Sequence, residues 1–289
     1  PPRSRGGKPI RTRKEGGPLP VRFYRSAVGK KWVMAVTGII LIGFVVVHAA
    51  NNAFGGWKEY NQMIGMGCAE KAIFSWGGNP GVGSLHRFRD AVENGWPNKL
   101  AIEEHSHAAM ANAYDAGAAG LPLAVLRGYV GADLPKVNPN IKSITCPFTG
   151  EKLAAVPAIR PDVGIVHAQK ADCAGNVMLE GIVGVQKEVV LGSKRSIVTV
   201  EEIVDDFGPR SPNAVILPSW TVSAIAVVPG GAYPSYTFGY YKRDNAFYKQ
   251  WDGIAKDRDS FLAWMKQNVL EKTPADFAVH AKKKLAAAE

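Results

Sequence analysis

The longest uncharged segment of this chain runs from Trp32 to Ala50, nineteen residues without Lys, Arg, Asp or Glu. An α-helix needs about 20 mostly apolar residues to cross the hydrocarbon core of a bilayer. A buried helix of a soluble protein is seldom apolar on every face, and a cleavable signal peptide has a shorter apolar run. The segment therefore predicts a transmembrane or membrane-inserting helix, which we assign to residues 22–52.

The net charge of +10 is concentrated at the N-terminus. Residues 1–31 contain ten Lys and Arg residues and a single acid, Glu15, whereas the rest of the chain is nearly neutral. Residues 1–21 are rich in Gly and Pro and almost free of apolar side chains, which predicts a disordered arm. Because the excess of positive charge is confined to this region, the charge does not indicate a nucleic-acid partner and leaves membrane contact through residues 32–50 open.

Cysteine and histidine do not form a recognisable disulfide or metal pattern. The cysteines are Cys68, Cys146 and Cys173, an odd number without a C-x-x-C pair. His105 and His107 are two residues apart, so a helix would place them on different faces. His167 ends a predicted buried strand and is interpreted as a core histidine. We therefore predict no metal site and a reducing cytoplasm as the setting.

Short apolar runs alternate with amphipathic stretches after residue 60, which is typical of an α/β domain. The predicted strands are Lys71–Trp76, Leu123–Tyr129, Asp162–His167, Ser196–Val200 and Ala224–Val228. The predicted helices are Ser84–Asn94, Glu104–Ala116 and Val185–Lys194, followed by two with the aromatic faces Phe247, Trp251, Ile254 and Phe261, Trp264, Met265. Asp259 is the predicted N-cap of the last helix.

The stretch SWGGNPGVGSLHRF, residues 75–88, places four glycines and one proline between a predicted strand and a predicted helix. Glycine lets the backbone turn sharply and approach a ligand closely, because it has no Cβ. Ser84 is placed to cap the helix, whose free N–H groups can bind an anion or a developing oxyanion. The stretch matches neither G-x-G-x-x-G nor a P-loop, and a purely structural turn is the alternative.

The N-terminal segment resembles the first helix of the cytochrome b membrane subunit of succinate dehydrogenase and fumarate reductase. The matching residues are Ser26, Gly29, Lys30, Lys31, Met34, Thr37, Gly38, His48, Asn51 and Asn52. The resemblance implies an axial haem ligand at His48. A haem held between helices needs a second axial ligand from another membrane helix, and no second apolar run of that length follows. We expect no haem, and a membrane cytochrome b subunit is an alternative function.

A broader resemblance covers about 210 residues, from Tyr60 to Leu270. This part resembles the alpha subunit of family I CoA-transferases, the family of glutaconate and 3-oxoacid CoA-transferases. The segments that carry the resemblance, in the family's order, are YNQMIGMGCAEKAIFSWGGNPGVGSLHRFRDAVENG, AAGLPLAVLRG, AAVPAIRPDVGIVHAQKADCAGNV, SIVTVEEIV and VPGGAYPSYTFGYYKRDN. The resemblance implies an α/β fold with an open, mostly parallel sheet.

The resemblance also implies a reaction in which CoA moves between carboxylic acids through a thioester on a glutamate of the beta subunit. No segment of this chain matches the beta subunit, so we assign no catalytic residue here and expect a beta-subunit partner. Coenzyme A is expected as a substrate. A CoA-thioester hydrolase of the same fold remains an alternative, because the residue that would discriminate the two lies on the partner.

The alpha subunit is expected to form one wall of the shared site. The candidate substrate- and CoA-binding residues are Gly77, Gly78, Asn79, Gly83 and Ser84 in the glycine-rich stretch, Gln169 after a predicted strand, and Gly230 and Gly231 in a third loop. Ligands of open α/β sheets bind beyond the carboxyl ends of the strands, where these segments fall. Glu201 and Glu202 would point to opposite faces of a strand, and either a site-facing or a structural role is open for them.

Alpha subunits of this family begin with a strand, a Gly-Gly turn and a helix, and here the hydrophobic segment stands in their place. Loss of that unit predicts an unpaired sheet edge. We interpret the chain as a chimera that carries an N-terminally truncated transferase domain. The predicted divisions are a basic arm (1–21), a hydrophobic helix (22–52), a junction (53–61), the transferase alpha-like domain (62–272), expected in the cytoplasm, and a tail (273–289).

Overall fold

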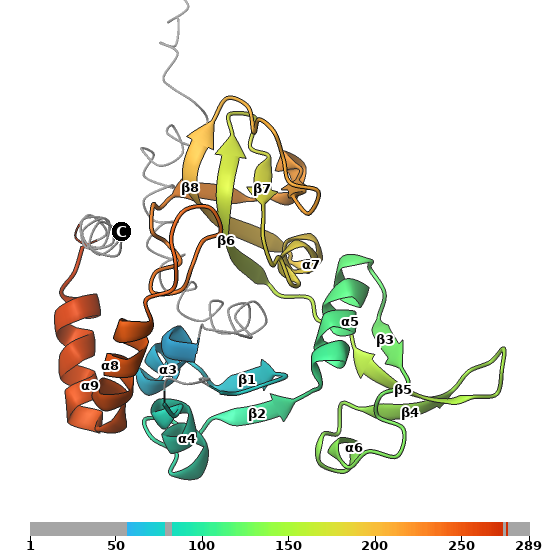
Figure 1. Ribbon diagram of the computed structural model, residues 1–289. Helices are drawn as coiled ribbons and strands as arrows, with labels where there is room; N and C mark the ends of the chain where they lie inside the picture. The colour runs from blue at the N-terminus through green and yellow to red at the C-terminus, as the bar shows by residue number, and fades with distance from the viewer. Residues whose placement is uncertain (1–56, 79–82, 274–275, 277–289) are drawn as a thin grey trace, which may run out of the picture. The chain divides into compact units, whose positions relative to one another are not determined.

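The structure, a computed structural model, describes residues 57–78, 83–273 and 276, all within one unit that spans residues 39–289 (Figure 1). The predicted arm (1–21) and hydrophobic helix (22–52) lie outside the described residues, as do Asn79 and most of the predicted tail. The interpretations placed on them, the chimera included, stay predictions. Within the described part of the chain, every helix is too short or too polar to cross a bilayer.

The described chain begins with α3 (Trp57–Gly65), β1 (Lys71–Phe74), α4 (His86–Glu93), β2 (Ala101–Glu104) and α5 (His107–Ala118). It continues with β3 (Leu123–Leu126), α6 (Leu134–Val137), β4 (Lys142–Thr145), β5 (Lys152–Pro157), β6 (Val163–Asp172), β7 (Val177–Leu179) and α7 (Gln186–Gly192). The last elements are β8 (Arg195–Val204), β9 (Val215–Leu217), the 3₁₀ turn η1 (Ser219–Thr221), β10 (Ala224–Val227), α8 (Asn245–Lys256), α9 (Arg258–Met265) and the π-helical turn η2 (Lys266–Leu270).

The largest sheet has the strand order β10–β8–β6–β7–β9. β8 runs parallel to β6 and β10, whereas β7 is antiparallel to β6 and β9. The β6–β7 connection is a four-residue turn, far shorter than a parallel crossover requires. Gly175 adopts a φ of +87° in this turn, and Asp172 Oδ1 accepts a hydrogen bond from Asn176 N.

Two smaller sheets precede it in the chain. β1 and β2 form a parallel pair, and β3, β5 and β4 form an antiparallel sheet in that order. The α/β class is confirmed, but the sheets are mixed, in contrast to the mostly parallel sheet implied by the resemblance. The difference arises at the β4–β5 and β6–β7 hairpins, where short turns leave no room for a covering helix.

Each predicted strand corresponds to an observed one, namely β1, β3, β6, β8 and β10, and the predicted helices correspond to α4, α5, α7, α8 and α9. The predicted cap at Asp259 is wrong. The N-cap of α9 is Asp257, which has extended backbone and whose side chain accepts a hydrogen bond from Ser260 N. Asp259 lies instead in the first turn of α9, where an acid is favoured by the helix dipole.

The core of the largest sheet is built on β6 and β8. Alternate residues of both strands, among them Val166, Ala168, Val198 and Val200, are buried on one face together with Val190 of α7. Farther along the chain, α8 and α9 pack against each other, and α8 contacts α3 and α4 (Figure 1). An aromatic cluster with Trp251 and Phe261 at its centre fills that second core.

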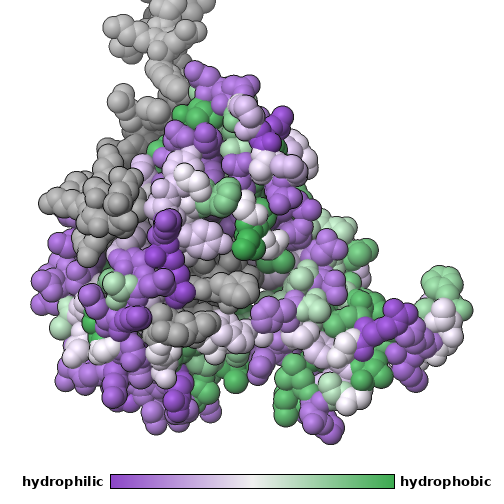
Figure 2. Space-filling model, in the orientation of Figure 1, coloured by the Kyte–Doolittle hydropathy of each residue, from purple (hydrophilic) through white to green (hydrophobic). Residues whose placement is uncertain are grey.

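Apolar side chains remain exposed around the three-stranded sheet. Figure 2 shows green surface in the region where Figure 1 places β3, β4 and β5. The exposed residues there include Leu121, Leu123, Val125, Val137 and Phe148, the last with 94% of its surface accessible. Monomeric proteins seldom leave large apolar patches open, so this surface has the character of an interaction site.

Candidate functional site

The C-terminal end of the glycine-rich stretch is hydrogen-bonded to a carboxylate of α8. Asp252 Oδ1 accepts a hydrogen bond from Ser84 N at 2.9 Å and lies 2.8 Å from His86 Nε2. Burial would raise the pKa of Asp252, but the contacts with Ser84 and His86 lower it below its ordinary value. The end of the turn is therefore fixed by a residue 168 positions away in the sequence.

Gly83 is required by this arrangement. Its φ is +96°, a conformation that residues with a Cβ rarely adopt. A Cβ added at Gly83 would lie 2.0 Å from Asp252 Oδ1. The sequence suggested that these glycines lie close to a ligand. In the structure, Gly83 lies close to the Asp252 carboxylate, and Gly78 lies close to the ring of Trp76.

The expected capping role of Ser84 is wrong. Helix α4 begins at His86 after an N-cap at Leu85 that makes no side-chain capping bond. The first amides of the helix, those of Arg87 and Phe88, instead donate to the side-chain oxygen of the buried Asn61, at 3.0 and 3.2 Å. Because Asn61 already occupies these donors, they are not available for the anion that we expected them to bind.

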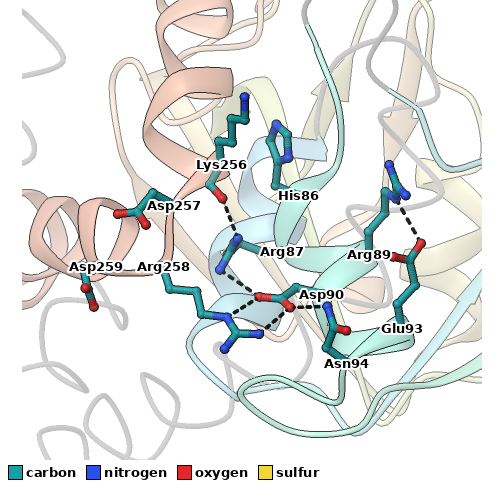
Figure 3. Close-up of a pocket in the computed structure, with 10 residues that line it drawn as sticks. All are labelled: His86, Arg87, Arg89, Asp90, Glu93, Asn94, Lys256, Asp257, Arg258 and Asp259. Carbon is teal, nitrogen blue, oxygen red and sulfur yellow. Dashed lines mark hydrogen bonds and ion pairs between the residues drawn. The ribbon is translucent and has the colours of Figure 1, made fainter.

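A cavity of about 530 Å³ lies between α4 and the α8–α9 junction (Figure 3). It is lined by His86, Arg87, Arg89, Asp90, Glu93, Asn94, Lys256, Asp257, Arg258 and Asp259. Arg258 donates two hydrogen bonds to Asp90, from Nε to Oδ2 at 2.8 Å and from Nη2 to Oδ1 at 2.7 Å. Arg87 Nη1 lies 3.1 Å from the same carboxylate, and Arg87 Nη2 donates to Lys256 O.

The charges of this cavity thus largely satisfy one another and join α4 to the C-terminal helices. The hydrogen bonds from Arg258 lower the pKa of Asp90 against the opposing effect of burial. The Arg87 guanidinium also stacks within 5.0 Å of the Trp96 ring. We interpret the cavity as a packing feature between helices and not as a reaction site.

Gln169 lies on β6, buried, with both ends of its amide bound to the backbone of Glu180. Its Nε2 donates to Glu180 O at 3.1 Å, and its Oε1 accepts from Glu180 N at 2.9 Å. This pairing fixes the chain where β7 ends. A side-chain amide nitrogen carries two N–H donors, so the bond to Glu180 O uses one of the two.

A buried carboxylate is the centre of a polar cluster on β6 and β8. Glu201 Oε1 lies 2.7 Å from His167 Nε2 and accepts hydrogen bonds from Tyr241 Oη at 2.8 Å and Thr237 Oγ1 at 3.2 Å. Its Oε2 accepts from Gly230 N at 2.7 Å. These five residues are called the Glu201 cluster below. Burial would raise the pKa of Glu201, but its hydrogen bonds, led by that of His167, lower it.

The cluster binds residues 229–244, the loop that follows β10, to the carboxyl half of β8. A Cβ added at Gly231 would lie 2.8 Å from the His167 ring, so the loop packs directly on that imidazole. Gly230 adopts a φ of +76° and directs its N–H into the cluster. The two predicted loop glycines are therefore brought to Glu201 and His167, and the amide of Gly230 is committed to an internal bond.

The histidines and acids follow the predicted pattern in part. His167 is satisfied on both sides, since its Nδ1 lies 2.8 Å from Thr199 Oγ1. Glu201 and Glu202 do point to opposite faces of β8, because Glu202 contacts Tyr240 and Lys170 and takes no part in the Glu201 cluster. The described residues include no group of three His, Cys, Asp or Glu side chains placed to share a metal ion.

Sequence reasoning missed the partners that organise the site. Asp252 and Asn61 gave no local signal, because each acts on a segment far from it in the sequence. Tyr241 and Thr237 were within a segment already singled out, VPGGAYPSYTFGYYKRDN, but only its glycines were chosen. The hydroxyl-rich composition of that segment, opposite a strand with two adjacent acids, was the signal that could have identified them.

Substitution of Gly83 tests whether the turn is structurally constrained. Gly83→Ala is expected to lower the free energy of unfolding by about 1–3 kcal/mol, because the new Cβ meets both the unfavourable φ and Asp252. Gly253→Ala is the control, since it lies inside α8 with open space around its Cβ. That change should stabilise the chain by about 0.5–1 kcal/mol. Urea denaturation measures both, and equal stabilities would refute the constraint.

The amino-acid sequence of this chain is similar to those of described enzymes. A profile of the family described as coenzyme A transferase matches residues 47–227. The A-type subunit of 3-oxoadipate CoA-transferase from Pseudomonas knackmussii is 66% identical over 210 residues, which cover 73% of this chain and 74% of the relative. The A-type subunit of glutaconate CoA-transferase from Acidaminococcus fermentans is 32% identical over 260 residues, 84% of this chain and 80% of the relative.

The fold has a counterpart among solved structures. The crystal structure of glutaconate coenzyme A-transferase from Acidaminococcus fermentans superposes with a TM-score of 0.73 at 29% sequence identity. The match covers 87% of this chain and 84% of that chain.

Proposed function

Because this chain belongs to the coenzyme A transferase family and is an alpha-type subunit of it, we propose that it serves the transfer of CoA between short dicarboxylic acids, with 3-oxoadipate as one of them. The observation that carries the proposal is the 66% identity to a subunit named for that substrate, across 74% of that subunit's length. At this identity the residues that line a shared site are expected to be largely retained.

The proposed reaction runs through a glutamate of the partner subunit. The glutamate carboxylate attacks the acyl-CoA carbonyl, the C–S bond breaks, and an acyl-glutamyl anhydride and CoA thiolate form. The thiolate then attacks the glutamyl carbonyl, which releases the first carboxylate and leaves a glutamyl-CoA thioester. The second carboxylate reverses these steps and leaves as its CoA ester.

The buried acid of this chain supports a nucleophile on the partner. Glu201 is surrounded by donors from His167, Tyr241, Thr237 and the Gly230 amide. Each bond stabilises the charged carboxylate and lowers its basicity, so Glu201 is a weaker nucleophile than a carboxylate without these donors. Its proposed role is to hold the 229–244 loop in place.

The site residues predicted from the sequence form the proposed contribution of this chain. Gly77, Gly78, Asn79, Gly83 and Ser84 are proposed to line the acyl group, with Gln169, Gly230 and Gly231 on the neighbouring wall. The second N–H of Gln169 is the donor that we propose for a substrate oxygen. The backbone amide of Ser84 already donates to Asp252, so this amide is not free to bind the substrate.

A beta subunit is the proposed partner. The two relatives with the quoted similarities are each named as one lettered subunit of a CoA-transferase, and apolar side chains of this chain are exposed around β3 and the β4–β5 hairpin. Covering such side chains in a subunit interface stabilises both partners. The location of the interface on this chain is a proposal.

Steady-state kinetics of the reconstituted complex tests the function. The full chain is co-expressed with a CoA-transferase beta subunit, then supplied with succinyl-CoA and 3-oxoadipate. Double-reciprocal plots at several fixed acceptor concentrations should give parallel lines, since the donor's carboxylate leaves before the acceptor binds. Rapid release of free CoA without any acceptor would indicate the thioester hydrolase of the same fold instead.

A further inference from the structure

Arg243 lies near the end of the 229–244 loop, two residues after Tyr241 of the Glu201 cluster. The next residue, Asp244, is the N-cap of α8 and accepts a hydrogen bond from Phe247 N through Oδ1. Its Oδ2 accepts from Tyr233 Oη at 2.6 Å. Each oxygen of the adjacent carboxylate thus accepts a hydrogen bond from a residue other than Arg243.

The guanidinium of Arg243 is stacked on an aromatic ring. Its central carbon lies 4.2 Å from the centroid of the Tyr248 ring, and Tyr248 is fully buried. A guanidinium stacked in this way directs its N–H groups along its own plane, away from the ring. The aromatic face thus fixes the orientation of Arg243 without using its hydrogen-bond donors.

One edge of that guanidinium is buried without a hydrogen-bond partner. Nε and Nη2 of Arg243 are both buried and meet no hydrogen-bond acceptor among the described residues. These two nitrogens form the edge that binds a carboxylate through two parallel hydrogen bonds. Arg258 shows the same edge filled, with its Nε and Nη2 on the two oxygens of Asp90 at 2.8 and 2.7 Å.

A buried cationic donor without an acceptor is costly, and an anion that binds during function is one explanation for such a donor. The edge requires a planar anion with two oxygens, and a carboxylate has that shape. Arg243 also lies in the loop that leaves the carboxyl end of β10, the edge at which open α/β sheets bind ligands.

We propose that Arg243 binds the distal carboxylate of the dicarboxylate substrate, the carboxylate that does not receive CoA. The inference rests on the proposed function and adds a specificity-determining residue to it. A dicarboxylate keeps one free carboxylate throughout the transfer, and the bidentate contact distinguishes it from a monocarboxylate of equal length. The stacked Tyr248 and the Glu201 cluster keep the guanidinium in position.

The test compares two matched acceptors, 3-oxoadipate and 3-oxohexanoate, with the complex of the full chain and its beta subunit. The acceptors have the same six-carbon chain, with a methyl group in place of the distal carboxylate in the second. Arg243→Met is expected to lower kcat/KM for 3-oxoadipate roughly 100-fold and to leave 3-oxohexanoate nearly unchanged. Arg243→Lys keeps the charge but not the fork, and a loss of about 10-fold is expected.

Lys242→Met is the control, because it removes the same charge from an exposed neighbour. It should leave both acceptors unaffected. Equal losses for both acceptors in Arg243→Met would overturn the inference and indicate a structural role. Dissociation of the complex on size-exclusion chromatography would also overturn it, since the carboxylate would then come from the beta subunit.

Binding separates this inference from the proposed function. If the wild-type complex transfers no CoA, the proposed function fails, and calorimetry with adipate and hexanoate then decides the role of Arg243. Adipate binding that is lost in Arg243→Met, while the melting temperature is retained, would support the inference. Adipate binding that is unchanged in that variant would contradict it.

Discussion

Replacing Glu201 by alanine is expected to lower the free energy of unfolding by about 3–5 kcal/mol, because the change breaks a buried hydrogen-bonded pair. The Glu201 side chain is 4% exposed and that of His167 is 10% exposed. The variant leaves the imidazole and the Gly230 amide facing an empty site. For a chain of this size, the loss corresponds to a fall of roughly 10 °C in the melting temperature, which calorimetry can measure.

Glu202→Ala is the matched control for that experiment. Glu202 is the adjacent acid on β8, but its side chain is 47% exposed, and there it pairs with Lys170 at 3.4 Å and accepts a hydrogen bond from Tyr240 Oη of the same loop. Exposed ion pairs contribute about 0–1 kcal/mol, so the control should melt close to the wild type. If the two variants were equally stable, the Glu201 cluster would not hold the 229–244 loop as we describe.

Replacing Asp90 by alanine is expected to have an effect of similar size, about 3–5 kcal/mol, through a different part of the molecule. Asp90 receives two hydrogen bonds from Arg258, one from Asn94, and an ion pair from the buried Arg87. Its loss leaves the Arg87 guanidinium, whose side chain is 4% exposed, without its carboxylate. Urea denaturation monitored by tryptophan fluorescence measures this loss, and Trp96, which packs on Arg87, is one of the seven tryptophans that contribute to the signal.

Glu93→Ala provides the comparison on the same helix. The pair between Arg89 and Glu93 is exposed on both sides and spans one helical turn. Such pairs contribute about 0.3–0.5 kcal/mol. A loss in Asp90→Ala no larger than that in Glu93→Ala would show that the network does not join α4 to the C-terminal helices.

The elements that the sequence predicted correctly are those with a repeated local pattern. Helix α8 has Phe247, Trp251 and Ile254 along one face, and strands β6 and β8 contain runs of β-branched residues. Some of the missed strands are short or polar, such as the three-residue β7 and β2 with the sequence AIEE, although the six-residue β5 is neither. Their pairing is set by turns and by neighbouring strands, which no window of the sequence contains.

The candidate site shows the same division between local and long-range information. The glycine-rich stretch and the loop with Gly230 were visible as composition; the structure confirms turns around Gly230, whereas residues 79–82 of the glycine-rich stretch lie outside the described residues. Their hydrogen-bond partners come from far away, Asp252 for Ser84 and Glu201 for Gly230, separated by 168 and 29 positions. For this reason the sequence could identify glycines in close contact with another group but could not identify the contacting residues.

Intact-protein mass spectrometry tests our proposal that this chain is the non-nucleophilic subunit of a CoA-transferase. The complex of this chain with its beta subunit is incubated with an acyl-CoA and no acceptor, and the mass of each subunit is measured. We expect that the beta subunit gains the mass of CoA less one water, whereas the mass of this chain is unchanged. A CoA adduct on this chain, or free CoA released with no adduct on either subunit, would contradict it.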